Sequence, residues 1–190
     1  MKFKEGHLYI FSGLPGAGKT TLAKCLATHI KASFLRIDTV EVGISDLCDS
    51  KVEGEGYRLS YRIAADNLRI GNSVVADSCN PIKLTRCEWQ DVALSNNSSY
   101  TNIEIICSDK DEHRKRIEER KCDIPGSIQP SWKQVVEHEY EPWAEDRVII
   151  DTASKSVKEC INELLSKLKL PHNKRGQGGQ SSAAPFFVLE

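Results

Sequence analysis

The chain has 190 residues, with 26 Lys and Arg against 27 Asp and Glu and a formal net charge of −1. This length suits a single well-cored domain, and the balanced charge argues against nucleic acid or an anionic membrane as a partner. Seven cysteines without a C-x-x-C pair favour a reducing cytoplasm over a secreted, disulfide-bonded protein. No segment has the apolar length of a signal peptide or a membrane span, so we expect a cytoplasmic protein.

Short apolar runs recur along the chain, and helical patterns separate them. The runs predict buried strands at residues 7–11, 33–37, 73–76, 102–107 and 147–151. The spacing of apolar residues and the intervening segments predict helices over 22–30, from about 39, and over 57–70, 82–95, 109–121, 131–141 and 157–168. Strands that alternate with helices indicate an α/β fold, in which crossover helices connect a mostly parallel sheet.

The C-terminal end differs in composition from the rest of the chain. Beyond residue 171, Gly, Gln, Ser and Ala predominate, and such a segment cannot bury enough apolar surface to order itself. We therefore expect one domain over residues 1–170 and a flexible tail over 171–190.

The first predicted strand leads into the most informative motif, Gly-Leu-Pro-Gly-Ala-Gly-Lys-Thr at residues 13–20. The stretch fits G-x-x-x-x-G-K-[ST] and lies between a strand and a helix, as that motif requires. Its glycines let consecutive backbone N–H groups surround an anion, and the following helix adds the positive end of its dipole. We predict a site for a nucleoside triphosphate and Mg²⁺ that is formed by Gly13, Leu14, Pro15, Gly16, Ala17, Gly18, Lys19, Thr20 and Thr21.

Two carboxylates follow predicted strands at the expected edge of the sheet. Asp77 comes after the strand expected beside the phosphate loop, and we predict that it holds Mg²⁺ together with the Thr20 hydroxyl. Asp38 follows the second strand, where it can orient or deprotonate an acceptor hydroxyl. Capping of a helix is the alternative role for each of them. Asp109 opens a D-x-x-E capping box, so we assign it a structural role.

Two further features separate a kinase from a switch GTPase. The sequence has no N-K-x-D motif, and no D-x-x-G follows the third strand. Residues 112–126 instead form an Arg-rich helix that runs into a Pro/Gly loop, with Arg116 and Arg120 four apart on one face. A solvated helix face is the alternative role for each arginine.

Taken together, the phosphate loop, "VVADSCNP", the R-x-x-x-R helix and "VIIDT" resemble the P-loop small-molecule kinases. That group includes adenylate, shikimate, gluconate and adenylylsulfate kinases and the chloramphenicol phosphotransferase. The resemblance is closer still to bacterial proteins described as AAA-family ATPases or as adenylylsulfate-kinase-like, and it covers about residues 6–168.

The resemblance implies a three-layer fold whose five-stranded parallel sheet has the order 2-3-1-4-5, with helices on both faces and a small lid at about 116–131. It also implies that Arg116 flanks the adenine, that Arg120 reaches the transferred phosphate from the lid, and that the turn at Asp151 and Thr152 lines the base. One departure is that the second strand ends in a single aspartate, where several of these kinases have paired carboxylates.

The acceptor pocket is expected over the sheet between the second and third strands. We select Asn80 with Asp38 as substrate contacts, from a wider set that comprises Arg36, Tyr57, Arg58, Tyr61, Arg86 and Trp89. Trp132 and Trp143 either close a lid over a ring-bearing substrate or pack its base.

These observations predict a kinase, monomeric or a homodimer, that transfers the γ-phosphoryl group of ATP to a hydroxyl of a small molecule. Lys19, Asp38 and Arg120 are its predicted catalytic residues. Three alternatives stay open at this point: a kinase for 5′-hydroxyl ends of nucleic acid, a toxin-like kinase of nucleotide sugars, and a nucleotide-binding regulatory ATPase.

Overall fold

The structure is a computed structural model that describes residues 5–49 and 51–171. The tail predicted over 171–190 lies, apart from Pro171, outside the described residues. None of the helices in the described part of the chain is long and apolar enough to cross a membrane.

Five parallel strands form one sheet in the order β2-β3-β1-β4-β5, which confirms the predicted topology. The strands are β1 (His7–Ser12), β2 (Ser33–Arg36), β3 (Val74–Asp77), β4 (Ser99–Ile106) and β5 (Val148–Asp151). The register places Asp77 beside Phe11 on one side and beside Arg36 on the other. The phosphate loop and the ends of β2 and β3 therefore meet at one edge of the sheet, where ligands bind in folds of this kind.

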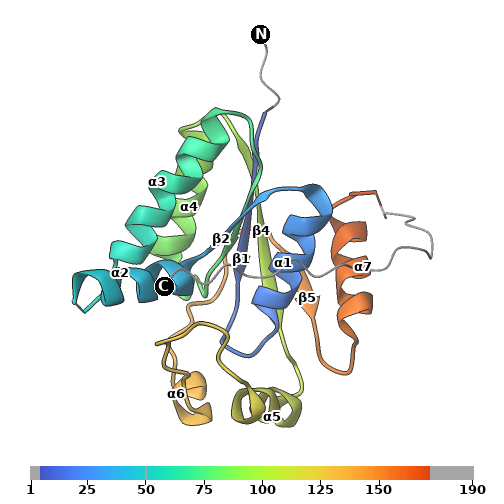
Figure 1. Cartoon of the computed structure of the whole chain (residues 1–190). Helices are drawn as coiled ribbons and strands as arrows, with labels where there is room; N and C mark the ends of the chain where they lie inside the picture. Colours follow the sequence, from blue (N-terminus) through green and yellow to red (C-terminus); the bar gives the residue numbers. More distant parts are fainter. Residues whose placement is uncertain (1–4, 50, 172–190) are drawn as a thin grey trace, which may run out of the picture.

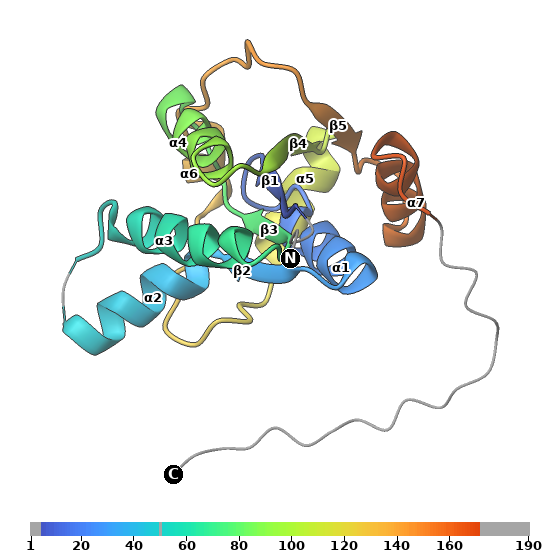
Figure 2. The same cartoon turned by 90° about the horizontal axis from the view of Figure 1, so that it is seen from above.

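Helices cover both faces of the sheet, so the molecule has three layers (Figures 1 and 2). On one face, α1 (Lys19–Ile30) and α7 (Val157–Lys167) pack Leu22, Leu26 and Leu164 against Phe11 and Ile105. On the other face lie α3 (Glu55–Arg69) and α4 (Lys83–Leu94), whose apolar side chains meet Leu8, Ile10 and Val74. Because both faces are buried, the strands read as continuous apolar runs in the sequence.

The remaining helices lie toward the carboxyl ends of the strands (Figure 1). They are α2 (Ile37–Cys48), α5 (Lys110–Glu119) and α6 (Trp132–Val136). As predicted, Asp109 caps α5, since its carboxylate accepts hydrogen bonds from the backbone N–H groups of Asp111 and Glu112.

Three predicted helix boundaries are wrong. The helix predicted over 131–141 ends at Val136. The Glu141 N–H donates to the Pro81 carbonyl (2.8 Å), so helical hydrogen bonding does not extend to 141 and this segment is tied to another loop. Helix α2 begins at Ile37, so Asp38 lies in its first turn and does not cap it. Helix α5 ends at Glu119, and Arg120 adopts an extended conformation, so Arg116 and Arg120 do not share a helix face.

Candidate active site

The loop between β1 and α1 has the backbone shape that phosphate binding requires. Gly13 and Gly16 have φ values of 131° and 81°, a region that side chains other than glycine rarely adopt. A Cβ atom at Gly13 would also collide with the Ile105 carbonyl oxygen. Helix α1 starts directly after the loop with no side-chain cap on its first N–H groups, so these donors point into the loop and are available to an anion.

Lys19 bends back over this loop. Its ammonium group donates to the Leu14 carbonyl oxygen (2.9 Å), and the residue is only 8% exposed. A charge held above the loop N–H groups lies where the β- and γ-phosphates of a nucleotide would lie.

The end of β3 provides a buried carboxylate that forms a long ion pair with Arg36 (3.9 Å). Asp77 is 3% exposed, and its Oδ2 accepts no hydrogen bond within the described part of the chain. Burial raises the pKa of Asp77, while the Lys19 charge and the Thr20 hydroxyl act in the opposite direction. A buried carboxylate oxygen beside a threonine hydroxyl fits the partial ligand set that a P-loop protein offers Mg²⁺, with the nucleotide supplying further oxygens.

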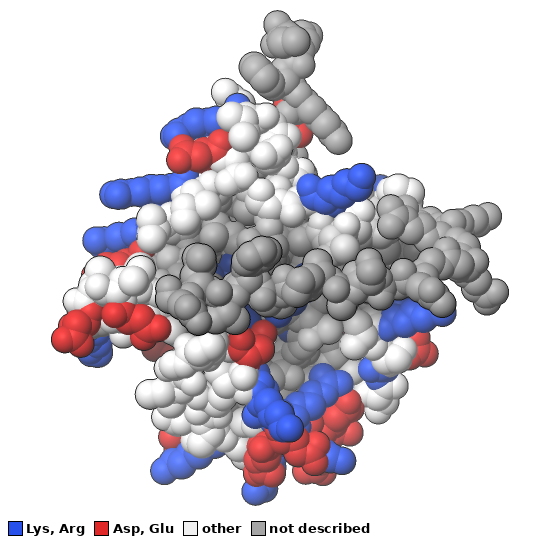
Figure 3. All heavy atoms as spheres, in the orientation of Figure 1, with Lys and Arg blue, Asp and Glu red and all other residues white. Residues whose placement is uncertain are grey.

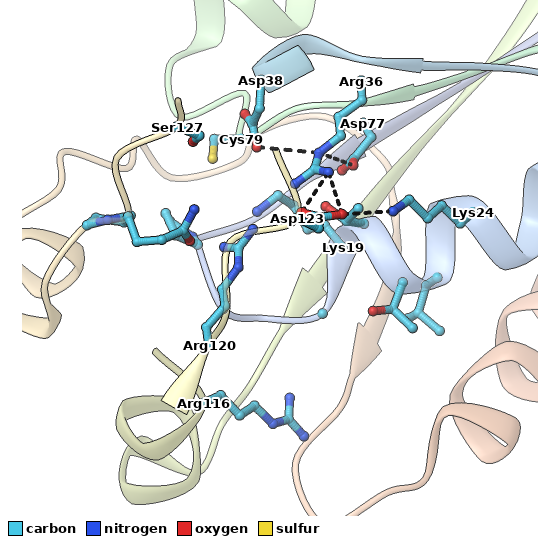
Figure 4. A pocket seen from close by; sticks show the side chains of 18 of the residues that line it. Lys19, Lys24, Arg36, Asp38, Asp77, Cys79, Arg116, Arg120, Asp123 and Ser127 are labelled. Atoms are coloured by element: carbon cyan, nitrogen blue, oxygen red, sulfur yellow. Dashed lines mark hydrogen bonds and ion pairs between the residues drawn. The ribbon is translucent and has the colours of Figure 1, made fainter. Parts of the chain in front are cut away.

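A cavity of ≈ 740 Å³ opens between the phosphate loop, α2, the end of β3 and the loop that follows α5. It brings together most of the side chains predicted for the site, namely Lys19, Thr20, Asp38, Asp77, Arg116, Arg120 and Thr152. Figure 4 shows Asp38, Arg36, Asp77 and Arg120 around this space.

Among the described residues, five predicted contacts are not in the cavity lining: Gly13, Leu14 and Ala17 of the phosphate loop, and Asn80 and Asp151. Asn80 is fully buried, and its amide donates to the Phe11 carbonyl oxygen (2.8 Å), which fixes the loop after β3 against β1. The Asp151 carboxylate accepts hydrogen bonds from the Ser108 and Ala153 N–H groups (both 3.1 Å) and so shapes the turn after β5. Direct contacts of Asn80 and Asp151 with a ligand stay predictions.

Arg116 joins the turn after β5 to α5. Its guanidinium donates to the hydroxyl (2.7 Å) and to the carbonyl oxygen (2.9 Å) of Thr152, and the Thr152 hydroxyl donates to the Ala17 carbonyl oxygen (2.9 Å). This chain of contacts ties α5, the turn after β5 and the phosphate loop together at the cavity wall.

Helix α2 carries a second carboxylate that the sequence analysis did not select. Glu41 lies one turn after Asp38 and also lines the cavity, so together they supply a carboxylate pair, although from a helix and not from the strand. The aliphatic part of the Glu41 side chain packs against the backbone of Gly56 in α3. Burial together with the Asp38 charge raises the pKa of Glu41. The i, i+3 spacing would have indicated the pair if the start of α2 at Ile37 had been known.

Arg36 connects the two sides of the cavity. The residue is 7% exposed, and its Nε lies 3.7 Å from Asp38 and 3.9 Å from Asp77. Its Nη1 donates to both carboxylate oxygens of Asp123 (3.0 and 2.9 Å), and Lys24 donates to the same carboxylate (3.1 Å). Partial burial of Asp123 opposes ionisation, but the hydrogen bonds from Lys24 and Arg36 outweigh it and lower the Asp123 pKa to about 2.

The aromatic candidates pack the protein interior or its loops. Trp89 is fully buried and meets Tyr61 edge to face, and Trp132 meets His113 in the same way. Trp143 lies against Arg86, which is itself fully buried. Among the described residues, Trp132 and Trp143 are not part of the cavity lining, and a contact of either with a substrate stays a prediction.

The sheet order, the glycine-rich loop and the carboxylate at the end of β3 together define a P-loop nucleotide-binding fold. The family model described as "AAA domain" (AAA_33) matches residues 8–129. The chain therefore belongs to this P-loop family, and the predicted resemblance is confirmed.

Two proteins of known sequence are similar to this chain to very different extents. An adenylyl-sulfate kinase from Synechococcus sp. (strain JA-2-3B'a(2-13)) is 26% identical over 180 residues, or 87% of this chain and 96% of that protein. A replication-associated recombination protein A from Haemophilus influenzae is 41% identical over 61 residues, which make up 31% of this chain. The matched segment spans only 14% of that second protein.

Solved structures with the same fold include several kinases. The Mycobacterium tuberculosis APS kinase in complex with AMPPNP and APS has a TM-score of 0.64 at 18% identity, covering 87% of this chain and 99% of that one. A gluconokinase from Sinorhizobium meliloti 1021 has a TM-score of 0.62 at 17% identity, covering 88% and 94%. At these identities the likeness shows the fold and leaves the reaction open.

Proposed function

We propose that the protein is an ATP-dependent kinase that transfers the γ-phosphoryl group to a hydroxyl of a small molecule. The observation that carries this proposal is the position of Asp38. Its side chain is 49% exposed and lines the cavity that the phosphate loop and Arg120 also line, while the buried Asp77 faces Lys19 and Thr20. One carboxylate is thus available to an acceptor and another to the metal-bound nucleotide.

Each residue has a distinct task in this reaction. The phosphate-loop N–H groups and Lys19 hold the β- and γ-phosphates, and Thr20 and Asp77 would hold Mg²⁺, which neutralises phosphate charge when bound. Asp38 accepts the proton of the acceptor hydroxyl. The hydroxyl oxygen forms a bond to the γ-phosphorus while the bond between that phosphorus and the departing ADP oxygen breaks. Arg120 follows the end of α5 in the same cavity and can stabilise charge on the transferred group.

The distribution of surface charge supports a small acceptor. Lys, Arg, Asp and Glu side chains are interspersed on the face that Figure 3 shows, whereas a nucleic-acid kinase needs a continuous basic track along the strand. This distribution favours a small acceptor that enters the cavity over a polynucleotide bound along a basic groove.

The test is an Asp38→Asn variant measured after a screen of alcohols, nucleosides, antibiotics and 5′-hydroxyl oligonucleotides for acceptor-dependent ADP release. We expect binding of the Mg²⁺–ATP complex within a few-fold of wild type and a transfer rate about 10² to 10⁴ lower, because asparagine keeps the shape but not the base. Glu41→Gln, made in parallel, reports which carboxylate accepts the proton.

Asp91→Asn, on the exposed surface of α4, is the matched control and should transfer at the wild-type rate. An Asp38→Asn protein that phosphorylates its acceptor as fast as wild type would contradict the assignment of Asp38. Acceptor-independent hydrolysis with every compound would instead support the regulatory ATPase.

A further inference from the structure

Asp123, in the loop after α5, forms ion pairs with two cationic side chains that line the cavity, Lys24 and Arg36 (Figure 4). Asp123 accepts hydrogen bonds from Arg36 through both of its oxygens and from Lys24 through one of them. A carboxylate bound by a guanidinium and an ammonium group has the geometry with which proteins bind free carboxylates and phosphates.

The two cationic residues belong to regular elements of the fold, whereas Asp123 belongs to a loop. Arg36 is 7% exposed at the end of β2, and Lys24 projects from α1 one turn after Thr20. The Asp123 side chain is 49% exposed and comes from a segment without helix or strand. Since partly exposed ion pairs are weak, an anion that enters the cavity can replace Asp123 at little cost.

The surroundings favour an anion over a cation at this position. Arg120 and Lys121 also line the cavity, and neither forms an ion pair within the described part of the chain. Arg36 Nε lies 3.7 Å from Asp38, so a molecule that places an anionic group on Arg36 brings its neighbouring atoms close to the proposed base.

We propose that Lys24 and Arg36 form a subsite for an anionic group of the acceptor, and that Asp123 occupies this subsite until the acceptor displaces it. The inference rests on the proposed function and narrows it, because it makes the acceptor an alcohol that carries a phosphate or a carboxylate a few bonds from the reacting hydroxyl.

The test measures binding, so it does not depend on phosphoryl transfer. The full chain is saturated with Mg²⁺ and a non-hydrolysable ATP analogue, which fills the phosphate loop, and is then titrated calorimetrically with inorganic phosphate and separately with acetate. The two probes distinguish a phosphate from a carboxylate. The variants are Asp123→Asn and Lys24→Gln, with Lys31→Gln as the control because this exposed lysine ends α1 outside the cavity.

If Asp123 is an internal competitor, Asp123→Asn binds at least one probe about two- to sixfold tighter, as expected from the loss of a weak ion pair that holds the subsite closed. Lys24→Gln binds that probe about fivefold more weakly than Lys31→Gln does. Unchanged affinity of Asp123→Asn for both probes, or equal affinities of the two lysine variants, would overturn the proposal. A failed kinase assay with a positive titration would refute the proposed reaction and leave the subsite standing.

Three matched alcohols add a readout of the reaction itself. Glycerol 3-phosphate and D-glycerate are compared with glycerol by ADP release. We expect wild type to prefer an anionic alcohol and Lys24→Gln to lose about fivefold of that preference, with Lys31→Gln unchanged. Measurable but equal turnover of charged and neutral alcohols by wild type would also overturn the proposal.

Discussion

The guanidinium carbon of Arg86 lies 4.2 Å from the centre of the Trp143 ring. The same group donates hydrogen bonds to carbonyl oxygens of two separate segments, Asn80 and Pro81 after β3 (2.9 and 2.8 Å) and Glu141 after α6 (2.7 Å). Arg86 is fully buried, and no ion pair with a carboxylate is present for it among residues 5–49 and 51–171. Backbone carbonyls and the Trp143 ring therefore stabilise the charge of Arg86. The residue holds the loop after β3 and the segment after α6 together.

Replacement of Arg86 by lysine should destabilise the protein even though the charge is kept. A lysine offers three donors in place of the planar fork, so at least one of these buried carbonyls loses its partner, which costs about 1–3 kcal/mol. Urea unfolding of Arg86→Lys measures the change. Arg62→Lys, on the exposed side of α3, is the control and should stay within about 0.5 kcal/mol. Equal midpoints for the two variants would contradict this role.

Much of the site could be predicted from the sequence because its residues are fixed by local rules. The spacing from Gly13 to Thr20 specifies a loop, a helix start and a lysine position within one short segment. Asp38 and Asp77 could be placed together because the ends of parallel strands meet at one edge of the sheet.

The rest depends on contacts between distant segments. Asp123 approaches Lys24 and Arg36 across more than 80 residues of sequence, and no periodic pattern carries that information. The bond from Glu141 to Pro81, which keeps residue 141 out of the predicted helix, is likewise a contact between distant segments. Glu41 was missed because the start of α2 was predicted two residues late.

Lys19→Ala should abolish triphosphate turnover while the protein stays folded. The ammonium group donates to the Leu14 carbonyl of the loop, so its removal takes away the charge beside the phosphates and little of the apolar packing. Circular dichroism checks the fold, and ADP release checks turnover. A folded Lys19→Ala protein with near wild-type turnover would exclude phosphate binding by this loop as the basis of activity.

Arg120→Ala should lower kcat far more than it lowers nucleotide affinity. An arginine that stabilises charge in phosphoryl transfer is worth about 10³ to 10⁵ in rate, and Arg120 lines the cavity without an ion-pair partner in the described residues. Arg114→Ala is the matched control, since Arg114 lies on the exposed face of α5 and pairs with Glu118. If both variants keep the wild-type kcat, Arg120 is only a solvated surface residue.

The ion pairs of Asp123 should make one contribution to stability depend on pH. The folded-state pKa of about 2 lies below the ordinary value of 3.8, so the stabilisation is present above about pH 4 and is lost as pH falls toward 2. Because the side chain is half exposed, the contribution is at most about 1 kcal/mol, or about 2–4 °C in Tm for a chain of this size.

Wild type should therefore melt slightly above Asp123→Asn at pH 7. This gap in Tm should narrow steadily between pH 4 and pH 2.5 as the wild-type carboxylate is protonated. Thermal melts of both proteins over this range measure the gap, and the comparison cancels the acid sensitivity that the two share. A gap that stays constant down to pH 2.5 would show that the Asp123 carboxylate is not held by Lys24 and Arg36 in solution.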